Sequence, residues 1–295
     1  MTEPLPDSDH EPDTVAAVAP GRAPLPIDAA TLPELDATYA DTLRDGLVAL
    51  GLMLDDGVSR AIDAHARLLL AWNEHINLTA IRTPEAVARL HVLDSLSAVS
   101  VLRGRVSEAT AILDLGSGCG YPGIPLALAL PAARLTLVDS VAKKARFLQV
   151  AADAVTAARK GASDRLAVDV QATRAEQLAA DERRESWDVV TVRAVGTLAE
   201  VAELGMPLLR RGGLLLCWKR VGGSTGTDPG APPGLDHELR HARALITDLG
   251  GDTPEVVAVE SAGLQGHRLV LVHKMRPTPR RFPRLLAERR HRLLR

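Results

Sequence analysis

The sequence predicts an α/β protein: a seven-stranded, mostly parallel sheet with one antiparallel strand, preceded by a smaller helical region. Two observations lead to this prediction. After residue 110, short apolar runs alternate with longer helical segments, and parallel strands need such crossover helices between them. Before residue 110, apolar residues recur at helical spacing instead.

The first 40 residues differ in composition from the rest of the chain. Residues 1–40 contain seven prolines and eight acids against a single arginine. Such a segment buries too little apolar area to offset the entropy that is lost on ordering. We therefore expect residues 1–40 to form a disordered, acidic, Pro-rich extension.

Residues 41–110 are predicted to form an N-terminal helical region. Five apolar residues at steps of three, four and seven lie on one face of its first helix: Val58, Ile62, Leu69, Trp72 and Ile76. A second helix is expected to begin at Thr83, which caps it, with Pro84 at its first position and Glu85 in its first turn.

Residues 111–274 are predicted to form the sheet domain. The first five strands that we expect are 112–115, 135–138, 166–170, 188–192 and 214–218. A Gly- and Pro-rich insert at 221–234 interrupts the pattern, and a helix at 235–249 follows it. Strands at 255–260 and 268–273 are joined by a short turn that contains Gly. We expect them to pair as a hairpin, which makes one strand antiparallel.

Charge and cysteine content indicate which partners and which cellular compartment to expect. The formal net charge is −2, but residues 274–295 hold nine Lys or Arg against one acid, so the chain has a basic tail, 275–295. Cys119 and Cys217 share no metal-ligand spacing with each other or with His residues, and no apolar run approaches ~20 residues. We expect a cytoplasmic monomer with no metal site and no membrane association.

Three glycines at alternate positions follow the first strand: Gly116, Gly118 and Gly120. Glycine lets the backbone turn sharply and approach a ligand, and open α/β sheets bind ligands at the carboxyl ends of their strands. Spacing alone does not identify the ligand. Counted from Gly118, the chain also matches the dinucleotide pattern Gly-x-Gly-x-x-Gly, which ends at Gly123.

Two carboxylates favour a nucleoside cofactor, and one of them favours S-adenosylmethionine. Asp114, two residues before the first glycine, would repel a pyrophosphate at the helix N-terminus but attract the ammonium of S-adenosylmethionine. Asp139 ends the second strand, where it can accept both ribose hydroxyls of a nucleoside. Both a dinucleotide and S-adenosylmethionine contain a ribose, so Asp139 does not distinguish between these two cofactors.

The segment 112–127 resembles the cofactor motif of the RsmG (GidB) family, the bacterial 16S rRNA guanine-N7 methyltransferases. Its continuation Pro122-Gly123-Ile124-Pro125 is unusual among methyltransferases and sharpens the resemblance. Further blocks extend it in the same order, from about residue 68 to the end of the last block: 72–73, 77–79, 89–91, 93–95, 137–140, 174–176, 193–194, 216 with 219, 267–272 and 278–284.

The resemblance implies a Rossmann-like class I methyltransferase fold, S-adenosylmethionine as the cofactor, and 16S rRNA or the small ribosomal subunit as the partner. It also implies five cofactor contacts: Gly116, Tyr121, Ala175, Glu176 and Arg193. Charge and backbone freedom add three further cofactor-binding residues: Asp114, Gly118 and Asp139.

No general acid or base is predicted, and methylation at N7 needs none. N7 of guanine carries an in-plane lone pair and no proton, and the leaving group is a neutral thioether, so alignment and fixed dipoles can supply the catalysis. Four residues are candidates for the substrate side: His91, Asp94, Asn73 and Lys219. A purely structural hydrogen-bonding role is equally open for His91, Asp94 and Asn73.

The basic tail is the predicted RNA-binding element. Arginine neutralises phosphates and an aromatic face stacks on bases, which points to four residues: Arg280, Arg281, Phe282 and Arg284. Arg220, where the family usually has a glycine, is a further cation at the carboxyl edge of the predicted sheet.

Together these features predict an S-adenosylmethionine-dependent methyltransferase that acts on N7 of a guanine in the decoding-region loop of 16S rRNA. Three alternatives stay open. The first is a methyltransferase of another RNA, a protein or a small molecule. The second is a dinucleotide-dependent dehydrogenase, and the third is a non-catalytic RNA-binding module.

Overall fold

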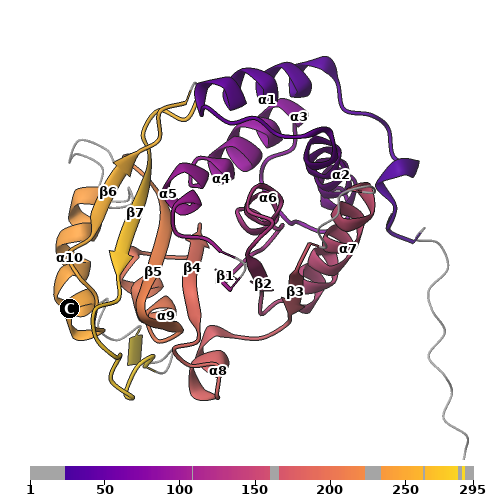
Figure 1. Ribbon diagram of the computed structural model, residues 1–295. Helices are drawn as coiled ribbons and strands as arrows, with labels where there is room; N and C mark the ends of the chain where they lie inside the picture. The colour runs from indigo at the N-terminus through magenta and orange to yellow at the C-terminus, as the bar shows by residue number, and fades with distance from the viewer. Residues whose placement is uncertain are drawn as a thin grey trace, which may run out of the picture.

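The computed structural model describes residues 24–107, 109–159, 166–222, 234–261, 263–284 and 288–289. Within them, seven strands form one sheet in the order β3-β2-β1-β4-β5-β7-β6 (Figure 1). The strands are β1 (Ala111–Leu115), β2 (Arg134–Val138), β3 (Val168–Gln171), β4 (Trp187–Arg193), β5 (Leu209–Arg220), β6 (Glu255–Ala258) and β7 (His267–His273). The strands β1 to β5 pair in parallel, and β7 runs antiparallel to its two neighbours. The predicted seven-stranded sheet with one antiparallel strand is confirmed.

Helices cover both faces of the sheet, so its central strands are apolar on both sides. Ile112 and Leu113, successive residues of β1, belong to separate cores because side chains alternate across a strand. The first core is covered by α2 (Asp56–Asn73), α6 (Gly123–Ala129) and α7 (Ala142–Ala158). The second is covered by α8 (Ala175–Ala180), α9 (Leu198–Gly205) and α10 (Leu235–Asp248). Because β1 to β5 are parallel, their carboxyl ends all lie at one edge of the sheet.

The first predicted helix corresponds to α2, which follows a shorter helix, α1 (Ala37–Ala49). Four of the five residues assigned to its apolar face are buried: Val58, Ile62, Leu69 and Trp72. Ile76 lies beyond the helix end at Asn73, so its helical assignment is wrong. It still packs partly buried against the same core.

The second predicted helix begins where the sequence indicated. Oγ1 of Thr83 accepts a hydrogen bond of 3.3 Å from the amide of Ala86. The chain then continues through four short helical segments: α3 (Pro84–Val87), η2 (Ala88–Leu93), α4 (Asp94–Leu96) and α5 (Val99–Arg103). The segment η2 is a π-helical turn, a rare geometry that often occurs at functional sites. It contains His91, one of the substrate-side candidates.

Residues 24–40 are not the disordered segment that their composition suggested. They contain the 3₁₀ turn η1 (Ala29–Thr31) and the start of α1. Nε1 of Trp72 donates a hydrogen bond of 2.7 Å to the carbonyl of Pro26. Three leucines of this segment pack on the helical core: Leu25, Leu32 and Leu35. These spaced apolar residues offset the entropy lost on ordering, and the average composition of residues 1–40 concealed them. Residues 1–23 lie outside the described residues.

The predicted helix after the insert is confirmed as α10, and β6 and β7 form the predicted antiparallel pair. Most of the insert, residues 223–233, lies outside the described residues. In the described part of the chain, no helix is both long and apolar enough to cross a membrane.

Candidate active site

The glycine loop turns sharply where β1 ends. Gly116, Gly118 and Gly120 have φ angles of +73°, +57° and +86°, a region that residues with side chains rarely adopt. A Cβ atom on Gly116 would also lie 2.6 Å from Cγ2 of Val195. The first glycine is therefore required both by its backbone conformation and by the space around it.

Asp114 supports this loop from beneath. It is 1% exposed; Oδ1 accepts a hydrogen bond of 2.9 Å from Oγ1 of Thr191, and Oδ2 accepts one of 3.2 Å from the amide of Gly123. Burial raises the pKa of Asp114 to about 6, against the lowering effect of these hydrogen bonds. The carboxylate joins β1 to β4 and to the start of α6, which is a structural role that the sequence did not indicate; its attraction for a cofactor ammonium stays a prediction.

Asp139 holds the loop from the neighbouring strand. Its Oδ2 accepts a hydrogen bond of 3.0 Å from the amide of Gly118, and its Oδ1 accepts one of 2.8 Å from the amide of Val141. Each carboxylate oxygen has a second lone pair, so both remain able to accept a hydroxyl. The carboxylate therefore positions the loop and still presents acceptors to a ligand.

A pocket of about 220 Å³ opens between the glycine loop and the ends of β2 and β3; we call it the glycine-loop pocket. Four of the predicted cofactor residues line it: Gly116, Asp139, Ala175 and Glu176. Arg289, from the C-terminal tail, lines it too and is ion-paired with Glu176. Sequence reasoning missed Arg289 in this pocket, because 113 positions separate it from its partner.

A second pocket, of about 450 Å³, lies at the carboxyl ends of β4 and β5; we call it the strand-end pocket. Arg193, assigned above to the cofactor, lies here and not in the glycine-loop pocket. Three of the four substrate-side candidates also line it: His91, Asp94 and Lys219. The structure thus brings together residues from segments more than 100 positions apart.

Asp94 is the centre of a charge network in the strand-end pocket. Its Oδ2 accepts a hydrogen bond of 3.1 Å from Arg193, and its Oδ1 lies 2.8 Å from Nδ1 of His267. Its main-chain carbonyl accepts a hydrogen bond of 2.7 Å from Nε1 of Trp218. A buried carboxylate is tolerated here because the Arg193 cation and the ring N–H of His267 compensate its burial. Sequence reasoning singled out neither His267 nor Trp218.

His91 is held in its neutral form. Arg193 donates a hydrogen bond of 2.8 Å to Nδ1 of His91, so Nε2 carries the proton and lies 3.0 Å from Oγ1 of Thr79. Burial, with the positive charge of Arg193, lowers the pKa of His91 to about 2. With both ring nitrogens occupied, His91 orients Arg193 and does not act as a proton acceptor.

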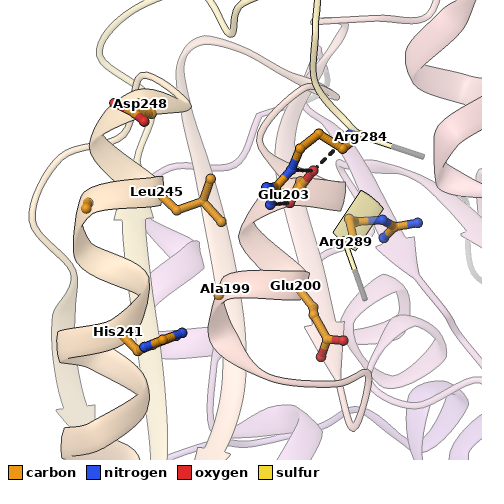
Figure 2. Close-up of a pocket in the computed structure, with 9 residues that line it drawn as sticks. Ala199, Glu200, Glu203, His241, Leu245, Asp248, Arg284 and Arg289 are labelled. Carbon is orange, nitrogen blue, oxygen red and sulfur yellow. Dashed lines mark hydrogen bonds and ion pairs between the residues drawn. The ribbon is translucent and has the colours of Figure 1, made fainter. Parts of the chain in front are cut away.

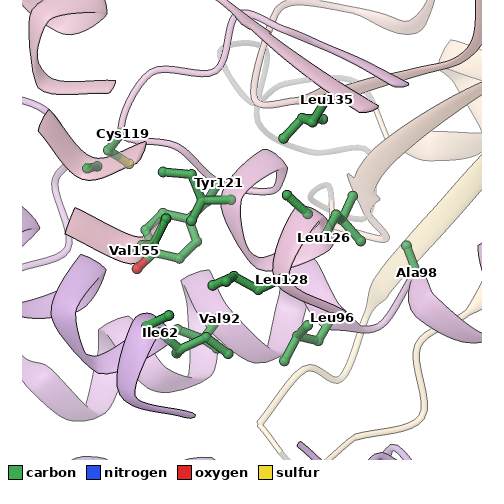
Figure 3. Close-up of a cluster of buried hydrophobic side chains, with 14 of the residues drawn as sticks. Ile62, Val92, Leu96, Ala98, Cys119, Tyr121, Leu126, Leu128, Leu135 and Val155 are labelled. Carbon is green, nitrogen blue, oxygen red and sulfur yellow. The ribbon is translucent and has the colours of Figure 1, made fainter. Parts of the chain in front are cut away.

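Tyr121 lies in a stack of three rings. Its ring is 4.3 Å from that of His65 and 4.7 Å from that of His91, between centroids, and it is nearly parallel to both. Figure 3 shows it among buried aliphatic side chains such as Ile62 and Val92. The side chain lines neither of the two pockets. The contact that the family resemblance assigned to Tyr121 would therefore have to come from its main chain.

His65 is a member of the stack that sequence reasoning missed. Its Nε2 donates a hydrogen bond of 2.8 Å to the carbonyl of Cys119 in the glycine loop, and burial lowers its pKa to about 4. His65 is three residues after Ile62 and four before Leu69, on the apolar face of α2. That helical spacing was the available signal for a buried histidine.

Asn73 lies outside the two pockets and orders the chain after α2. Its Oδ1 accepts hydrogen bonds from the amides of Leu78, at 2.9 Å, and Thr79, at 3.0 Å. Its Nδ2 donates a bond of 3.0 Å back to the carbonyl of Thr79. Asn73 therefore places Thr79 against His91, which is the structural role that the sequence left open for it.

Lys219 holds the loop that follows β4. Its Nζ donates to the carbonyl of Gly196, at 3.0 Å, and to Oε2 of Glu238, at 2.7 Å. In this loop Ala194 has a φ of +57°, which a residue with a side chain adopts only at a cost. Between Ala194 and Gly196 lies Val195, which lines both pockets. Val195 is therefore the side chain at which the two pockets meet.

The tail segment 274–284 lies at the opposite, amino edge of the sheet. Nζ of Lys274 bonds the carbonyl of Leu209, the first residue of β5, at 2.8 Å. Arg184, three residues before β4, donates to the carbonyls of Thr278 and Phe282, at 3.0 and 2.9 Å. The tail is therefore anchored to the main chain of the sheet domain.

This anchoring changes the assignments made for the tail. Phe282 is 5% exposed, so the expectation that its face stacks on RNA bases is wrong. Arg284 donates two bonds of 2.8 Å to Oε1 of Glu203 on α9, one from its amide and one from Nε (Figure 2). Arg280 and Arg281 remain exposed.

Within the described part of the chain, no cluster of His, Cys, Asp or Glu is arranged to hold a metal ion. Cys119 and Cys217 are both buried free thiols, and burial raises their pKa values to about 11 and about 12. Neither thiol is therefore ionised near neutral pH, and neither is suited to nucleophilic chemistry.

Comparison with known proteins identifies similar sequences along most of the chain. Residues 59–222 match the model of the GidB family, described as rRNA small subunit methyltransferase G. The chain is 36% identical over 253 residues to the ribosomal RNA small subunit methyltransferase G of Symbiobacterium thermophilum, which covers 85% of this chain and 96% of that protein. It is 37% identical over 240 residues to the protein of the same name from Roseiflexus castenholzii, covering 80% of this chain and 92% of that one.

Proposed function

Because the chain belongs to the GidB family, we propose that it transfers the methyl group of S-adenosylmethionine to N7 of a guanine in the decoding-region loop of 16S rRNA. The family supplies the reaction class, and the geometry of the two pockets supports it. The protein is an S-adenosylmethionine-dependent rRNA methyltransferase. Its partner is 16S rRNA or the small ribosomal subunit, and its place of action is the cytoplasm.

The observation that carries this function is the meeting of two pockets at Val195. The glycine-loop pocket has acidic acceptors for a nucleoside, and the strand-end pocket has a size and an apolar wall that suit a base. Both open at the carboxyl edge of the sheet, where α/β folds bind ligands. A methyl donor on one side of Val195 and an acceptor base on the other would be close enough to react.

The residues of the glycine-loop pocket fit the adenosine part of S-adenosylmethionine. Gly116 has no side chain to obstruct it, and Asp139 keeps lone pairs for the two ribose hydroxyls. The amide of Ala175 and the carboxylate of Glu176 can bond the adenine edge. Across Val195, Arg193 supplies a cation for the carboxylate of the methionine part. When bound, S-adenosylmethionine supplies an electrophilic methyl group on a positively charged sulfur.

The chain's own residues act by alignment and electrostatics. Guanine N7 needs no deprotonation, which agrees with a neutral His91 that has no free ring nitrogen. Leu90, Val192 and Trp218 line the strand-end pocket and exclude water from a base held there. Among the described residues that line this pocket, Asp94 is the one carboxylate. Its negative charge stabilises the positive charge that develops on the methylated base.

Exposed arginines supply the contacts to the RNA backbone in this proposal. Arg220 lines the strand-end pocket, so it is placed for a phosphate near the target base. Arg280 and Arg281, at the amino edge, would contact a more distant part of the 16S rRNA. The ion-paired Arg284 and the buried Phe282 are left out of this interface.

The proposal is tested by mapping N7-methylguanine in 16S rRNA. Chemical strand scission at N7-methylguanine is compared in rRNA from cells with and without the gene. We expect one scission site in the decoding-region loop to disappear without the gene. It should return when the purified protein and S-adenosylmethionine are added to small subunits from the deficient cells. An unchanged scission pattern would show that the proposed function is wrong.

A further inference from the structure

One histidine that lines the strand-end pocket, His267, uses only one of its two ring nitrogens in hydrogen bonds to the described residues. Both ring nitrogens of His91 are occupied by Arg193 and Thr79, and both carboxylate oxygens of Asp94 are occupied by Arg193 and His267. Lys219 is engaged with a carbonyl and a carboxylate. His267, the first residue of β7, bonds Asp94 through Nδ1, and no residue in the described part of the chain bonds its Nε2, which is therefore available to a ligand in the pocket.

We propose that His267 reads the target guanine by accepting a hydrogen bond from its N1–H at Nε2. This inference rests on the proposed function and names the group that recognises its substrate base. A carboxylate only accepts hydrogen bonds, so Asp94 fixes the proton of His267 on Nδ1. Nε2 then presents a lone pair. Guanine N1 carries a hydrogen whereas adenine N1 is itself an acceptor, so this lone pair selects guanine.

The order of the strands leaves room for such a base between His267 and the end of β4. In the sheet, β5 lies between β4 and β7, so two strand spacings, about 10 Å, separate His267 on β7 from the end of β4. N1 and N7 lie on neighbouring edges of guanine, on either side of O6. A guanine held at N1 by His267 lies above β5, so the adjacent edge that carries N7 is free to face β4 and Val195, where the glycine-loop pocket begins.

The same hydrogen bond assists the reaction. The N7 lone pair forms the new bond to carbon while the carbon–sulfur bond breaks and its electrons stay on sulfur. The base thereby gains a positive charge, which makes N1–H a stronger donor, and its proton remains shared with Nε2 of His267. The hydrogen bond is stronger in the transition state than in the ground state, and such interactions raise kcat.

The test is a methylation assay with small subunits that lack the modification and S-adenosylmethionine with a tritiated methyl group. We expect His267→Ala to lower kcat on the order of 100-fold, with little change in KM for the subunit. His267→Gln should recover at least a tenth of the wild-type kcat, because its amide oxygen replaces the acceptor. His273→Ala, at the other end of β7, is the matched control and should keep the wild-type rate.

Cofactor affinity by calorimetry separates recognition from folding. Both His267 variants should bind S-adenosylmethionine as the wild type does. A wild-type kcat in His267→Ala would overturn the inference and leave the proposed function intact. Equal losses in His267→Ala and His267→Gln, or a shared loss of cofactor binding, would show that His267 only braces Asp94. A wild-type protein that methylates no guanine would remove the proposed function and this inference together.

Discussion

The carboxylate of Glu176 at the start of α8 is ion-paired with the guanidinium of Arg289, and both side chains line the glycine-loop pocket. Arg289 is 7% exposed, and its Nε has no partner within the described part of the chain. A cofactor that bonds Glu176 must therefore compete with Arg289. The basic tail and the proposed cofactor site meet in this one ion pair.

Replacing Arg289 by alanine should tighten the binding of S-adenosylmethionine. The change frees the carboxylate of Glu176, and a partly exposed ion pair is worth about 1 kcal/mol, so the gain in affinity should be roughly fivefold. Isothermal titration calorimetry measures it. Arg284→Ala is the control, since Arg284 pairs with Glu203 outside this pocket. Weaker binding in Arg289→Ala would instead make Arg289 a cofactor ligand.

Replacing Asp139 by alanine should weaken cofactor binding without unfolding the domain. The variant loses the acceptors for the ribose and the bond that holds Gly118, and a hydrogen bond to a charged group is worth about 1.5–3 kcal/mol. We expect the dissociation constant to rise roughly 10- to 100-fold. Asp169→Ala, an exposed aspartate on β3, should bind as the wild type does. Unchanged affinity in Asp139→Ala would contradict the assignment.

Regular patterns explain why much of the fold was predictable. The strands were found because alternate residues, such as Ile112 and Leu113, must pack on opposite faces of the sheet. The glycine loop was found because its backbone has positive φ values that favour glycine. Both signals are local, so a single sequence carries them.

Side-chain direction and distant partners were not predictable in the same way. A carboxylate at the end of β1 can face a ligand or lie beneath the loop, and the second outcome for Asp114 depends on Thr191, 77 positions away. Phe282 is buried in a tail segment whose carbonyls Arg184 binds, 98 positions earlier. His267 became a candidate through its contact with Asp94. These contacts depend on tertiary packing, which composition and spacing do not encode locally.

The buried carboxyl of Asp114 should give folding stability a distinct pH dependence. Its pKa is raised from 3.8 to about 6 in the folded protein, so the folded state binds this proton more tightly than the unfolded chain does. The contribution of this group to the free energy of unfolding is full below about pH 4 and falls as the pH rises to about 6. A rise of two pKa units corresponds to about 3 kcal/mol.

Urea unfolding of the wild type and of Asp114→Asn from pH 4 to pH 7 tests this dependence. The asparagine does not titrate, so the wild-type stability should fall by about 3 kcal/mol relative to the variant over this range. The lost bond to Gly123 adds only a constant offset. Asp169→Asn, at an exposed position, should run parallel to the wild type. A constant difference between the wild type and Asp114→Asn would contradict the raised pKa.

Lys274 should be a major stabilising residue of the tail. It is fully buried, and its Nζ donates to Glu185 at 2.7 Å and to the carbonyls of Met206 and Leu209 at 2.7 and 2.8 Å. Lys274→Met leaves these acceptors without their donor and should lower the free energy of unfolding by about 2–4 kcal/mol, less than for a fully buried pair because Glu185 is partly exposed. Lys143→Met, at an exposed position on α7, should change it little. Equal midpoints in urea for both variants would refute this role.

The two groups of exposed arginines should affect methylation differently, because they lie at opposite edges of the sheet. Arg220 lines the strand-end pocket, so Arg220→Ala should raise KM for the small subunit and also lower kcat, since the phosphate beside the target base loses its cation. A double replacement, Arg280→Ala with Arg281→Ala, should raise KM alone, because these side chains do not line the strand-end pocket and so do not align the base.

Salt dependence of subunit binding distinguishes these contacts from general charge effects. Each lost phosphate contact lowers the slope of log affinity against log salt by about 1, so we expect a decrease of about 1 for Arg220→Ala and about 2 for the double variant. Arg146→Ala, an exposed arginine on α7 outside the proposed interface, controls for net charge and should leave the slope unchanged. If the double variant also lowered kcat, the RNA bound at the amino edge would have to be coupled to the alignment of the base. If its slope did not change, Arg280 and Arg281 would not contact the RNA, and the interface would be confined to the carboxyl edge around Arg220.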